Sequence, residues 1–235
     1  MEHYHREAEN GNVEAMVNLA NAYRDGNGCE ADIYLSAEWA EKAAINGSLL
    51  GMILAGIAFF ILGHVQLKIG AIEDDTIENL IKSKYWLEKA VLNGYGQQEA
   101  DSTLDSANND LGDCYFVRKQ YQEAFDCYSK SSTSNSAVNI AIITLGNNLP
   151  LSTSDDVFVF NKLVASLPSD EIDQEKNADG YLMLGIMYQL GIGTKQNADE
   201  GHRCLTQAKN LGCEDAIDEL RKYKKKLFGG YKFVG

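Results

Sequence analysis

Hydrophobic residues recur along this chain at the three- and four-residue spacing of amphipathic helices, and glycines interrupt the pattern at intervals. The first 47 residues contain one complete cycle: a helix, a turn with two glycines, a second helix and a closing glycine. The residues that define this cycle are Ala15, Leu19, Tyr23, Gly26, Gly28, Asp32 as an N-cap, Ala37, Trp39, Ala43 and Gly47.

The same cycle returns near the C-terminus, displaced by 165 positions. An internal repeat of helix pairs is typical of solenoids, in which each unit packs only on its neighbours. We therefore predict an all-α fold, a superhelix of antiparallel helix pairs, with one elongated domain over residues 1–226. The matching residues are Tyr23 and Tyr188, Gly26 and Gly191, Gly28 and Gly193, and Ala43 and Ala208.

Alignment of the cycle along the chain predicts five helix pairs, a final helix and a short tail. In the second pair about eleven extra residues, from Gly63 to Asp75, are expected between the two helices, and Asp75 with Glu78 is expected to form a capping box. The fourth pair matches the cycle poorly. The predicted units cover residues 8–45, 46–92, 94–132, 135–168 and 173–211, the final helix 213–226 and the tail 227–235.

A run of fourteen mostly apolar residues, Leu49–Leu62, has the composition of a membrane segment. A spanning helix needs roughly twenty such residues, and shorter runs are more often buried helices. In the repeat register this run is the first helix of the second pair. We therefore predict no membrane span.

Three sequence motifs point to a known family. Residues 184–193 follow the pattern Leu-Gly-x-x-Tyr-x-x-Gly-x-Gly, Asp32 is the capping aspartate, and residues 39–44 follow Trp-x-x-Lys-Ala-Ala. The chain thus resembles the Sel-one-like repeat, a relative of the tetratricopeptide repeat, although Cys204 and Asn197 replace the tryptophan and the aspartate in the fifth unit. The resemblance implies a right-handed solenoid that scaffolds protein complexes, often in bacteria and in signalling or envelope-related roles.

Charge and cysteine content narrow the range of partners and compartments. The net charge of −13 repels nucleic acid and favours a basic protein or peptide. The five cysteines are odd in number and form no Cys-x-x-Cys pair, which indicates reduced thiols and a cytoplasmic protein. The first ten residues lack the apolar core of a signal peptide, and a periplasmic or secreted location stays open if such a peptide has been removed.

No catalytic or phosphate-binding motif occurs in the sequence, so we predict a non-enzymatic protein without cofactor or metal. His202, Cys204 and Cys213 are the best metal-ligand candidates, but positions 202 and 204 of one helix point about 200° apart. A surface histidine and a core cysteine are the simpler interpretation. The basic run 221–226 is interpreted as a solvated helix end, with a docking patch as the alternative.

In tetratricopeptide superhelices the first helix of each unit lines the concave groove, and by that resemblance ten residues are candidates for partner contact. The middle of the set is apolar, as expected for a groove that holds a peptide or an amphipathic helix. The alternative is that Ile57, Phe60 and Ile142 are packed by the Gly63–Asp75 insertion or by neighbouring helices. The candidates are Asn21, Arg24, Ile57, Phe60, Asp113, Phe116, Ile142, Leu145, Ile186 and Gln189, with Arg24, Asp113 and Phe116 favoured.

The leading functional hypothesis is an adaptor that holds a protein segment in this groove. A bacterial immunity-type inhibitor of a cognate toxin is the alternative, because it also explains a small acidic chain. Self-association through an incompletely capped end of the solenoid stays open as well.

Overall fold

The computed structural model describes residues 1–146, 149–167, 177–226 and 229–234, and it divides into two compact units, Met1–Lys119 and Gln120–Gly235. The predicted start of the fifth helix pair, at residue 173, lies outside the described residues. The described residues form twelve α-helices and one two-stranded antiparallel sheet, which confirms an all-α repeat fold. The hand of a superhelix and the assignment of one domain stay predictions.

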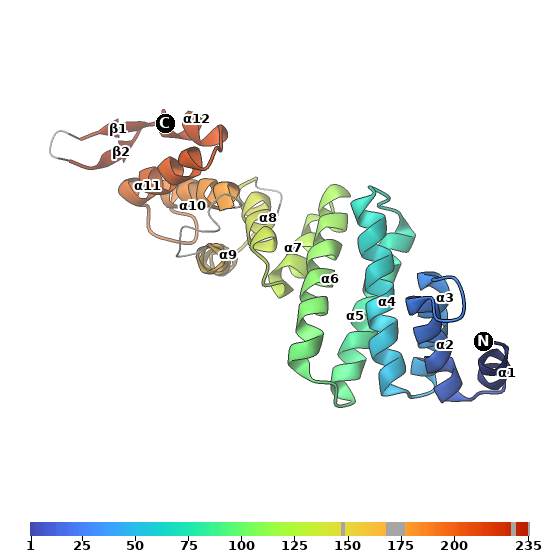
Figure 1. Cartoon of the computed structure of the whole chain (residues 1–235). Helices are drawn as coiled ribbons and strands as arrows, with labels where there is room; N and C mark the ends of the chain where they lie inside the picture. The colour runs from blue at the N-terminus through green and yellow to red at the C-terminus, as the bar shows by residue number, and fades with distance from the viewer. Residues whose placement is uncertain (147–148, 168–176, 227–228, 235) are drawn as a thin grey trace. The chain divides into compact units, whose positions relative to one another are not determined.

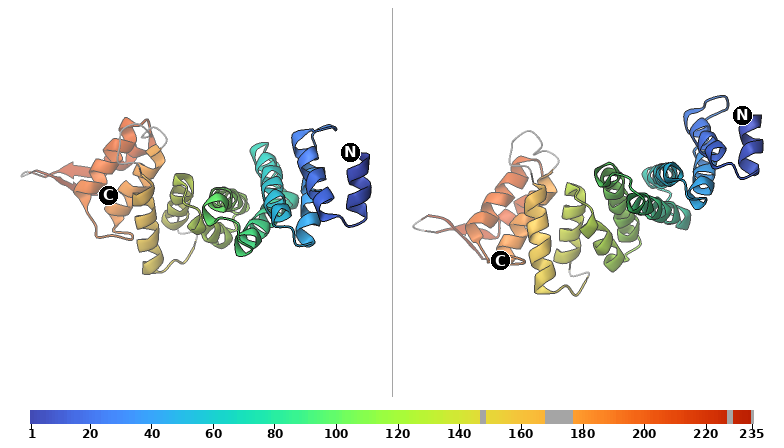
Figure 2. Two further views of the ribbon diagram at one scale, coloured as in Figure 1. Left: turned by 60° about the horizontal axis from the view of Figure 1, so that its bottom comes forward. Right: turned by 90° about the horizontal axis from the view of Figure 1, so that it is seen from below.

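Unit 1 consists of six helices that follow one another as antiparallel neighbours (Figure 1). Sequential helices pack together, and in addition α2 contacts α4 and α4 contacts α6, so these three helices form one layer. Figure 2 shows the same helices from two further directions, with α1 beside α2 at the N-terminus. The helices are α1 (Glu2–Glu9), α2 (Val13–Asp25), α3 (Ile33–Ile45), α4 (Leu49–Lys68), α5 (Asp74–Leu92) and α6 (Gln97–Val117).

Local signals set the helix ends of the first repeat as predicted. The Asp32 side chain accepts hydrogen bonds from the backbone N–H groups of Tyr34 and Leu35 and so caps α3. Gly26 ends α2 with φ of 70°, a left-handed conformation that glycine adopts without a steric penalty. Helix α1 was not predicted, because residues 1–10 lie outside the repeat and their apolar positions are few.

The insertion predicted between the helices of the second pair is wrong. Helix α4 continues through Gly63 to Lys68, so the extra residues lengthen the helix pair instead of forming a loop. Gly63 faces Leu80, and two helical turns earlier Gly56 faces Leu87 in the same antiparallel register. The missing side chain at each glycine lets α4 and α5 approach closely, and the longer pair gains a second contact of the same kind.

The capping box predicted at Asp75 and Glu78 is also wrong. Helix α5 begins at Asp74, and the fully buried Thr76 hydroxyl accepts from the Glu73 N–H (3.3 Å) and donates to the Ala71 carbonyl (2.5 Å). Two backbone groups of the α4–α5 connection are thereby satisfied in a buried position. Glu78 instead pairs with Lys82 one turn later on α5.

Helix α4 has 20 residues and is long and apolar enough to span a membrane by length and composition. Here it packs between α3 and α5, and half of its most apolar window is buried. Its buried residues, among them Leu54, Ala55 and Phe59, belong to one core cluster with residues of α1, α2, α3 and α5. The apolar composition of α4 therefore serves contacts on several of its faces.

The described residues of unit 2 form six further helices and end in a hairpin (Figure 1). Helix α10 packs against α8, α9 and α11, and the core near the C-terminus contains Leu182, Leu205, Ala208 and Ala216. The elements are α7 (Tyr121–Lys130), α8 (Ser134–Leu145), α9 (Thr153–Ser166), α10 (Ala178–Leu190), α11 (Ala198–Asn210), α12 (Asp215–Leu220), β1 (Tyr223–Lys225) and β2 (Tyr231–Phe233).

The prediction of a final helix over residues 213–226, followed by a separate tail, is corrected by the structure. Helix α12 is only six residues long, and the basic run continues as strand β1, which pairs with β2 from the predicted tail. Tyr223 and Phe233 form one cross-strand pair and both pack on the core near α11. Burial of aromatic side chains at alternate positions favours a strand over a longer helix here. Within the predicted tail, residues 227, 228 and 235 lie outside the described part of the chain.

Candidate partner-binding surfaces

Six of the ten predicted contact residues lie on α2, α4 and α6, the three helices of one layer in unit 1. Arg24 is exposed and the other five are half-buried, so part of each side chain remains open to solvent. The structure thus places these residues on three adjoining helices, and their role in partner contact stays a prediction. The six are Asn21 and Arg24 on α2, Ile57 and Phe60 on α4, and Asp113 and Phe116 on α6.

Arg24 already has a counter-charge. Its guanidinium donates to both carboxylate oxygens of Asp25, at 2.7 and 2.9 Å. The hydrogen bond from Arg24 lowers the pKa of the Asp25 carboxyl, and the same bond raises the pKa of Arg24. A partner that used Arg24 would have to compete with this pair.

A histidine–carboxylate pair that the sequence analysis missed joins α4 to α6 in the same layer. His64 Nδ1 lies 2.6 Å from Asp110 Oδ2, and the His64 ring lies 5.3 Å from the Phe60 ring. The His64 side chain is 38% exposed, whereas that of Asp110 is 7% exposed. His64 follows Phe60 by four residues and Asp110 precedes Asp113 by three, so each shares a helix face with a predicted residue. Only the packing of α4 on α6 could reveal that the two faces meet.

Four predicted residues lie in unit 2, on α8 and α10, and one of them is wrong as a contact residue. Gln189 is 2% exposed, and its Nε2 donates to Glu219 Oε2 of the α12 helix at 3.1 Å. The short α12 covers this position, which the prediction of a longer, separate final helix did not anticipate. Ile186 is half-buried against the C-terminal core, and Ile142 and Leu145 are half-buried on α8.

Comparison with protein families matches the Sel1 repeat model to residues 13–48, 70–95, 106–136 and 178–213, more than half of the chain. The chain belongs to the Sel1 repeat family. The matched segments include the pairs α2–α3 and α10–α11, and they leave out all of α4 and all of α9. Sel1 repeats in general form non-catalytic scaffolds that mediate protein–protein interactions.

Solved structures with a Sel1-type fold resemble the chain at low sequence identity. A Sel1 repeat protein from Oxalobacter formigenes is 17% identical with a TM-score of 0.44, covering 88% of this chain and 77% of its own. A protective antigen of uropathogenic Escherichia coli with an SLR fold is 18% identical with a TM-score of 0.39, and 94% of this chain spans 58% of that antigen. A putative Sel1 repeat protein from Klebsiella pneumoniae is 20% identical, with a TM-score of 0.28 and coverage of 93% and 96%. A search of curated proteins gives no match.

The first Sel1 repeat carries a small pocket where α1 meets α2, with a volume of about 290 Å³. Asn21, one of the predicted contact residues, contributes to its wall, so α1 covers part of the surface expected to be open. The residues that line it are Met1, Tyr4, Asn18, Asn21, Ala22, Asn27 and Gly28.

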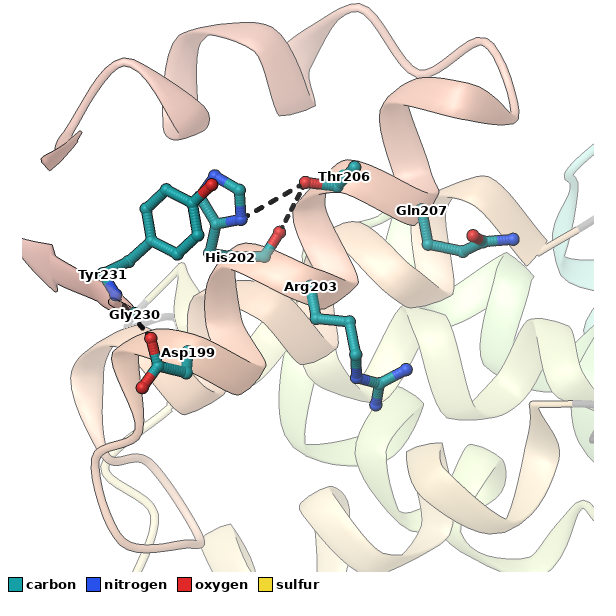
Figure 3. A pocket seen from close by; sticks show the side chains of 7 residues that line it. All are labelled: Asp199, His202, Arg203, Thr206, Gln207, Gly230 and Tyr231. Carbon is teal, nitrogen blue, oxygen red and sulfur yellow. Dashed lines mark hydrogen bonds between the residues drawn. The ribbon is translucent and has the colours of Figure 1, made fainter. Parts of the chain in front are cut away.

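The last Sel1 repeat carries a larger pocket of about 510 Å³ between α11 and the hairpin (Figure 3). The ring of Tyr231 stacks on that of His202, with centroids 3.4 Å apart and planes 10° apart, and the Tyr231 N–H donates to Asp199 Oδ1. Burial lowers the pKa of His202, an effect that the charge of Asp199 partly opposes. The lining residues are Asp199, His202, Arg203, Thr206, Gln207, Gly230 and Tyr231.

The metal-ligand candidates of the last Sel1 repeat have separate surroundings. His202 lies under Tyr231, whereas Cys204 is fully buried in the helix interface, where burial raises its thiol pKa to about 11. Among the residues that the structure describes, no three His, Cys, Asp or Glu side chains form a group suited to a metal ion. His202 therefore serves as an aromatic platform for the hairpin.

Proposed function

We propose that this Sel1 repeat protein is a non-enzymatic adaptor that holds a segment of a partner protein on the α2–α4–α6 face of unit 1. The observation that supports this most is the strip of half-exposed residues that crosses α4 and α6: Phe60, His64, Asp113 and Phe116, with Asp110 beneath. Aromatic groups flanked by polar ones are the composition of interface hot spots.

The chemistry of this strip indicates what kind of segment it would hold. Half-buried Ile57, Phe60 and Phe116 offer apolar contact area, and the carboxylates of Asp110 and Asp113 lie beside them. The whole chain carries a net charge of −13, which raises the local concentration of basic partners. The segment that fits is therefore an amphipathic helix or extended peptide with apolar anchors and basic residues.

Photo-crosslinking from inside and outside the face tests this proposal. Benzoyl-phenylalanine replaces Phe60 or Phe116 on the α2–α4–α6 layer, and Tyr34 on α3 serves as the matched control because it is an aromatic residue that is 62% exposed. Ligands are peptides selected on the intact chain from a random display library. We expect adducts from positions 60 and 116 and none from position 34. Adducts from position 34 alone would place binding on the opposite layer and refute the proposal.

Affinity provides a second readout on the same peptides. Truncation of a buried aromatic anchor costs about 2 kcal/mol or more in an interface, whereas peripheral residues cost little. Phe116→Ala is therefore expected to weaken binding by about thirtyfold, and Tyr34→Ala by less than about twofold. Equal losses for both variants would contradict the assignment of the face. Far-UV circular dichroism of each variant checks that the helices are intact.

A further inference from the structure

The positive charge of this acidic protein is concentrated at its C-terminal end. The last fifteen residues contain six of the 21 Lys and Arg residues and none of the 34 Asp and Glu residues. Arg221 and Lys222 pair with Asp218 and Glu219 on α12. Within the described part of the chain, no carboxylate lies within ion-pair distance of the four other lysines, which are Lys224, Lys225, Lys226 and Lys232.

The hairpin places three of these lysines, Lys224, Lys226 and Lys232, on one face against their mutual repulsion, whereas Lys225 alternates to the other face. Lys224 and Lys232 are directly opposite each other across the two strands. The ladder bonds from Val234 N–H to the Lys222 carbonyl and from Lys226 N–H to the Gly230 carbonyl flank this pair, so Lys226 points to the same face. Like charges at directly opposed positions destabilise an antiparallel pair, and a bound anionic group would relieve that repulsion.

The hairpin is held firmly by its other face. Tyr231 stacks on His202, the Tyr223 ring meets the same histidine edge-on at 5.5 Å, and Tyr223 also contacts Phe233. Gly201 leaves room for the Tyr223 hydroxyl, because a Cβ at that position would collide with it. A two-stranded hairpin is marginally stable alone, and this docking on α11 gives it a fixed orientation.

The two edges of the hairpin differ in what occupies them. On the β2 edge, the Tyr231 N–H is taken by the Asp199 carboxylate of α11, which lies beside this strand. In an antiparallel pair, every second residue of a strand turns its backbone N–H and C=O groups toward the partner strand. In β1 the backbone groups of Lys224 face β2, so those of its neighbours Tyr223 and Lys225 point away from β2. Among the residues that the structure describes, these groups of β1 have no hydrogen-bond partner. The β1 edge is thus a template for one more strand.

We propose that this β1 edge binds an acidic, extended segment of another protein as a third strand. Backbone pairing would supply affinity, and carboxylates at alternate positions would meet Lys224 and its neighbours. Nucleic acid fits less well, because it cannot use a backbone edge and the other 220 residues of the chain are strongly acidic. Pairing of β1 with β1 of a second copy would bring the lysines of the two copies together and is disfavoured.

The test uses the full chain and a fluorescein-labelled peptide of four Glu-Val repeats, with binding read by anisotropy. We expect saturable binding that a Lys-Val peptide of equal length does not show. Lys224→Gln with Lys232→Gln is expected to weaken binding threefold to tenfold, on the order of two surface ion pairs. Lys195→Gln with Lys209→Gln removes the same charge from exposed positions elsewhere in unit 2 and is expected to leave it unchanged. Equal binding by both double variants overturns the proposal.

Backbone methylation separates strand addition from simple charge attraction. In an antiparallel third strand the valine amides face β1 and the glutamate amides face solvent, so N-methylation of the valines should abolish binding and N-methylation of the glutamates should not. On the protein side, Lys225→Pro removes an N–H that points away from β2, and Lys225→Thr is its charge-matched control. Only the proline variant is expected to lose binding.

Three results would each contradict the proposal. The first is equal binding by both methylated peptides, which would leave only an electrostatic patch. The second is equal affinity for a twelve-residue thymidine oligonucleotide, which would indicate a general polyanion site. The third is self-association of the chain in sedimentation that the Lys224→Gln, Lys232→Gln variant abolishes, which would make a second copy the occupant.

Discussion

Replacement of Gly63 by alanine tests the close contact that lengthens the second helix pair. A Cβ at this position would lie 2.6 Å from Leu80 Cγ and 3.2 Å from the Thr76 carbonyl oxygen. Leu80 is fully buried, and protein interiors are close-packed, so a shift of this side chain carries a cost. Overpacking of this kind costs about 1–3 kcal/mol, and the better helix propensity of alanine returns about 1 kcal/mol. We expect Gly63→Ala to lower the free energy of unfolding by about 1 kcal/mol.

The sign of the effect should reverse when Leu80 is truncated. Leu80→Ala alone costs about 2–5 kcal/mol because it leaves a cavity. In that background the Gly63→Ala methyl group has room, so only the helix-propensity gain remains and the substitution should stabilise by about 1 kcal/mol. The coupling free energy between the two sites is then about 2 kcal/mol.

Urea unfolding of the four proteins, followed by circular dichroism at about 222 nm, measures this cycle. Because the comparison is between variants of one chain, equal m-values in all four would show that the same surface is exposed on unfolding. If Gly63→Ala stabilised the chain in both backgrounds, or if the coupling were zero, the close approach of α4 and α5 at this position would be wrong.

Three further predictions concern unit 2. Gly193→Ala is expected to lower the free energy of unfolding by about 2 kcal/mol or more and to speed amide exchange in α9, because φ is 67° and a Cβ would strike the Asp156 carbonyl. Burial lowers the pKa of His202, so the neutral ring contributes to stability above about pH 6.5, and this contribution is lost as the pH falls below that value. His202→Phe keeps a stacking ring that does not titrate, so the free energy of unfolding, measured by urea titration, should decrease less at low pH. Cys204, with its pKa of about 11, should resist alkylation by iodoacetamide at about pH 8 while the half-buried Cys29 reacts, as read by mass spectrometry of peptides.

The sequence predicted much of the fold because repeat helices depend on local signals. The apolar spacing of α2, the Asp32 cap and the turn glycines Gly26 and Gly191 each act within a few residues of the chain. Such signals need no knowledge of distant partners. The same holds for the assignment of the Sel1 repeat, whose motif residues define one helix pair at a time.

The sequence was misleading where a distant contact decides a local conformation. Gly63 marks a possible break, yet α4 continues through it because Leu80 fills the space that the missing side chain leaves. Arg221 to Lys226 have the composition of a helix end, but β1 forms because Tyr223 and Tyr231 gain burial against His202. In both places tertiary packing outweighs a propensity difference of about 1 kcal/mol per residue.

The candidate sites divide in the same way. The sequence by itself determined which helices carry Phe60 and Phe116 and that the protein is acidic, since these follow from periodicity and composition. Only the tertiary structure decided that His64 meets Asp110 and that Gln189 is covered. It also decided that three lysines of the C-terminus, Lys224, Lys226 and Lys232, share one face of a hairpin. These contacts join segments that are far apart in the chain. The periodicity of the sequence specifies which residues share one face of a helix or strand, but it does not specify which other element packs against that face.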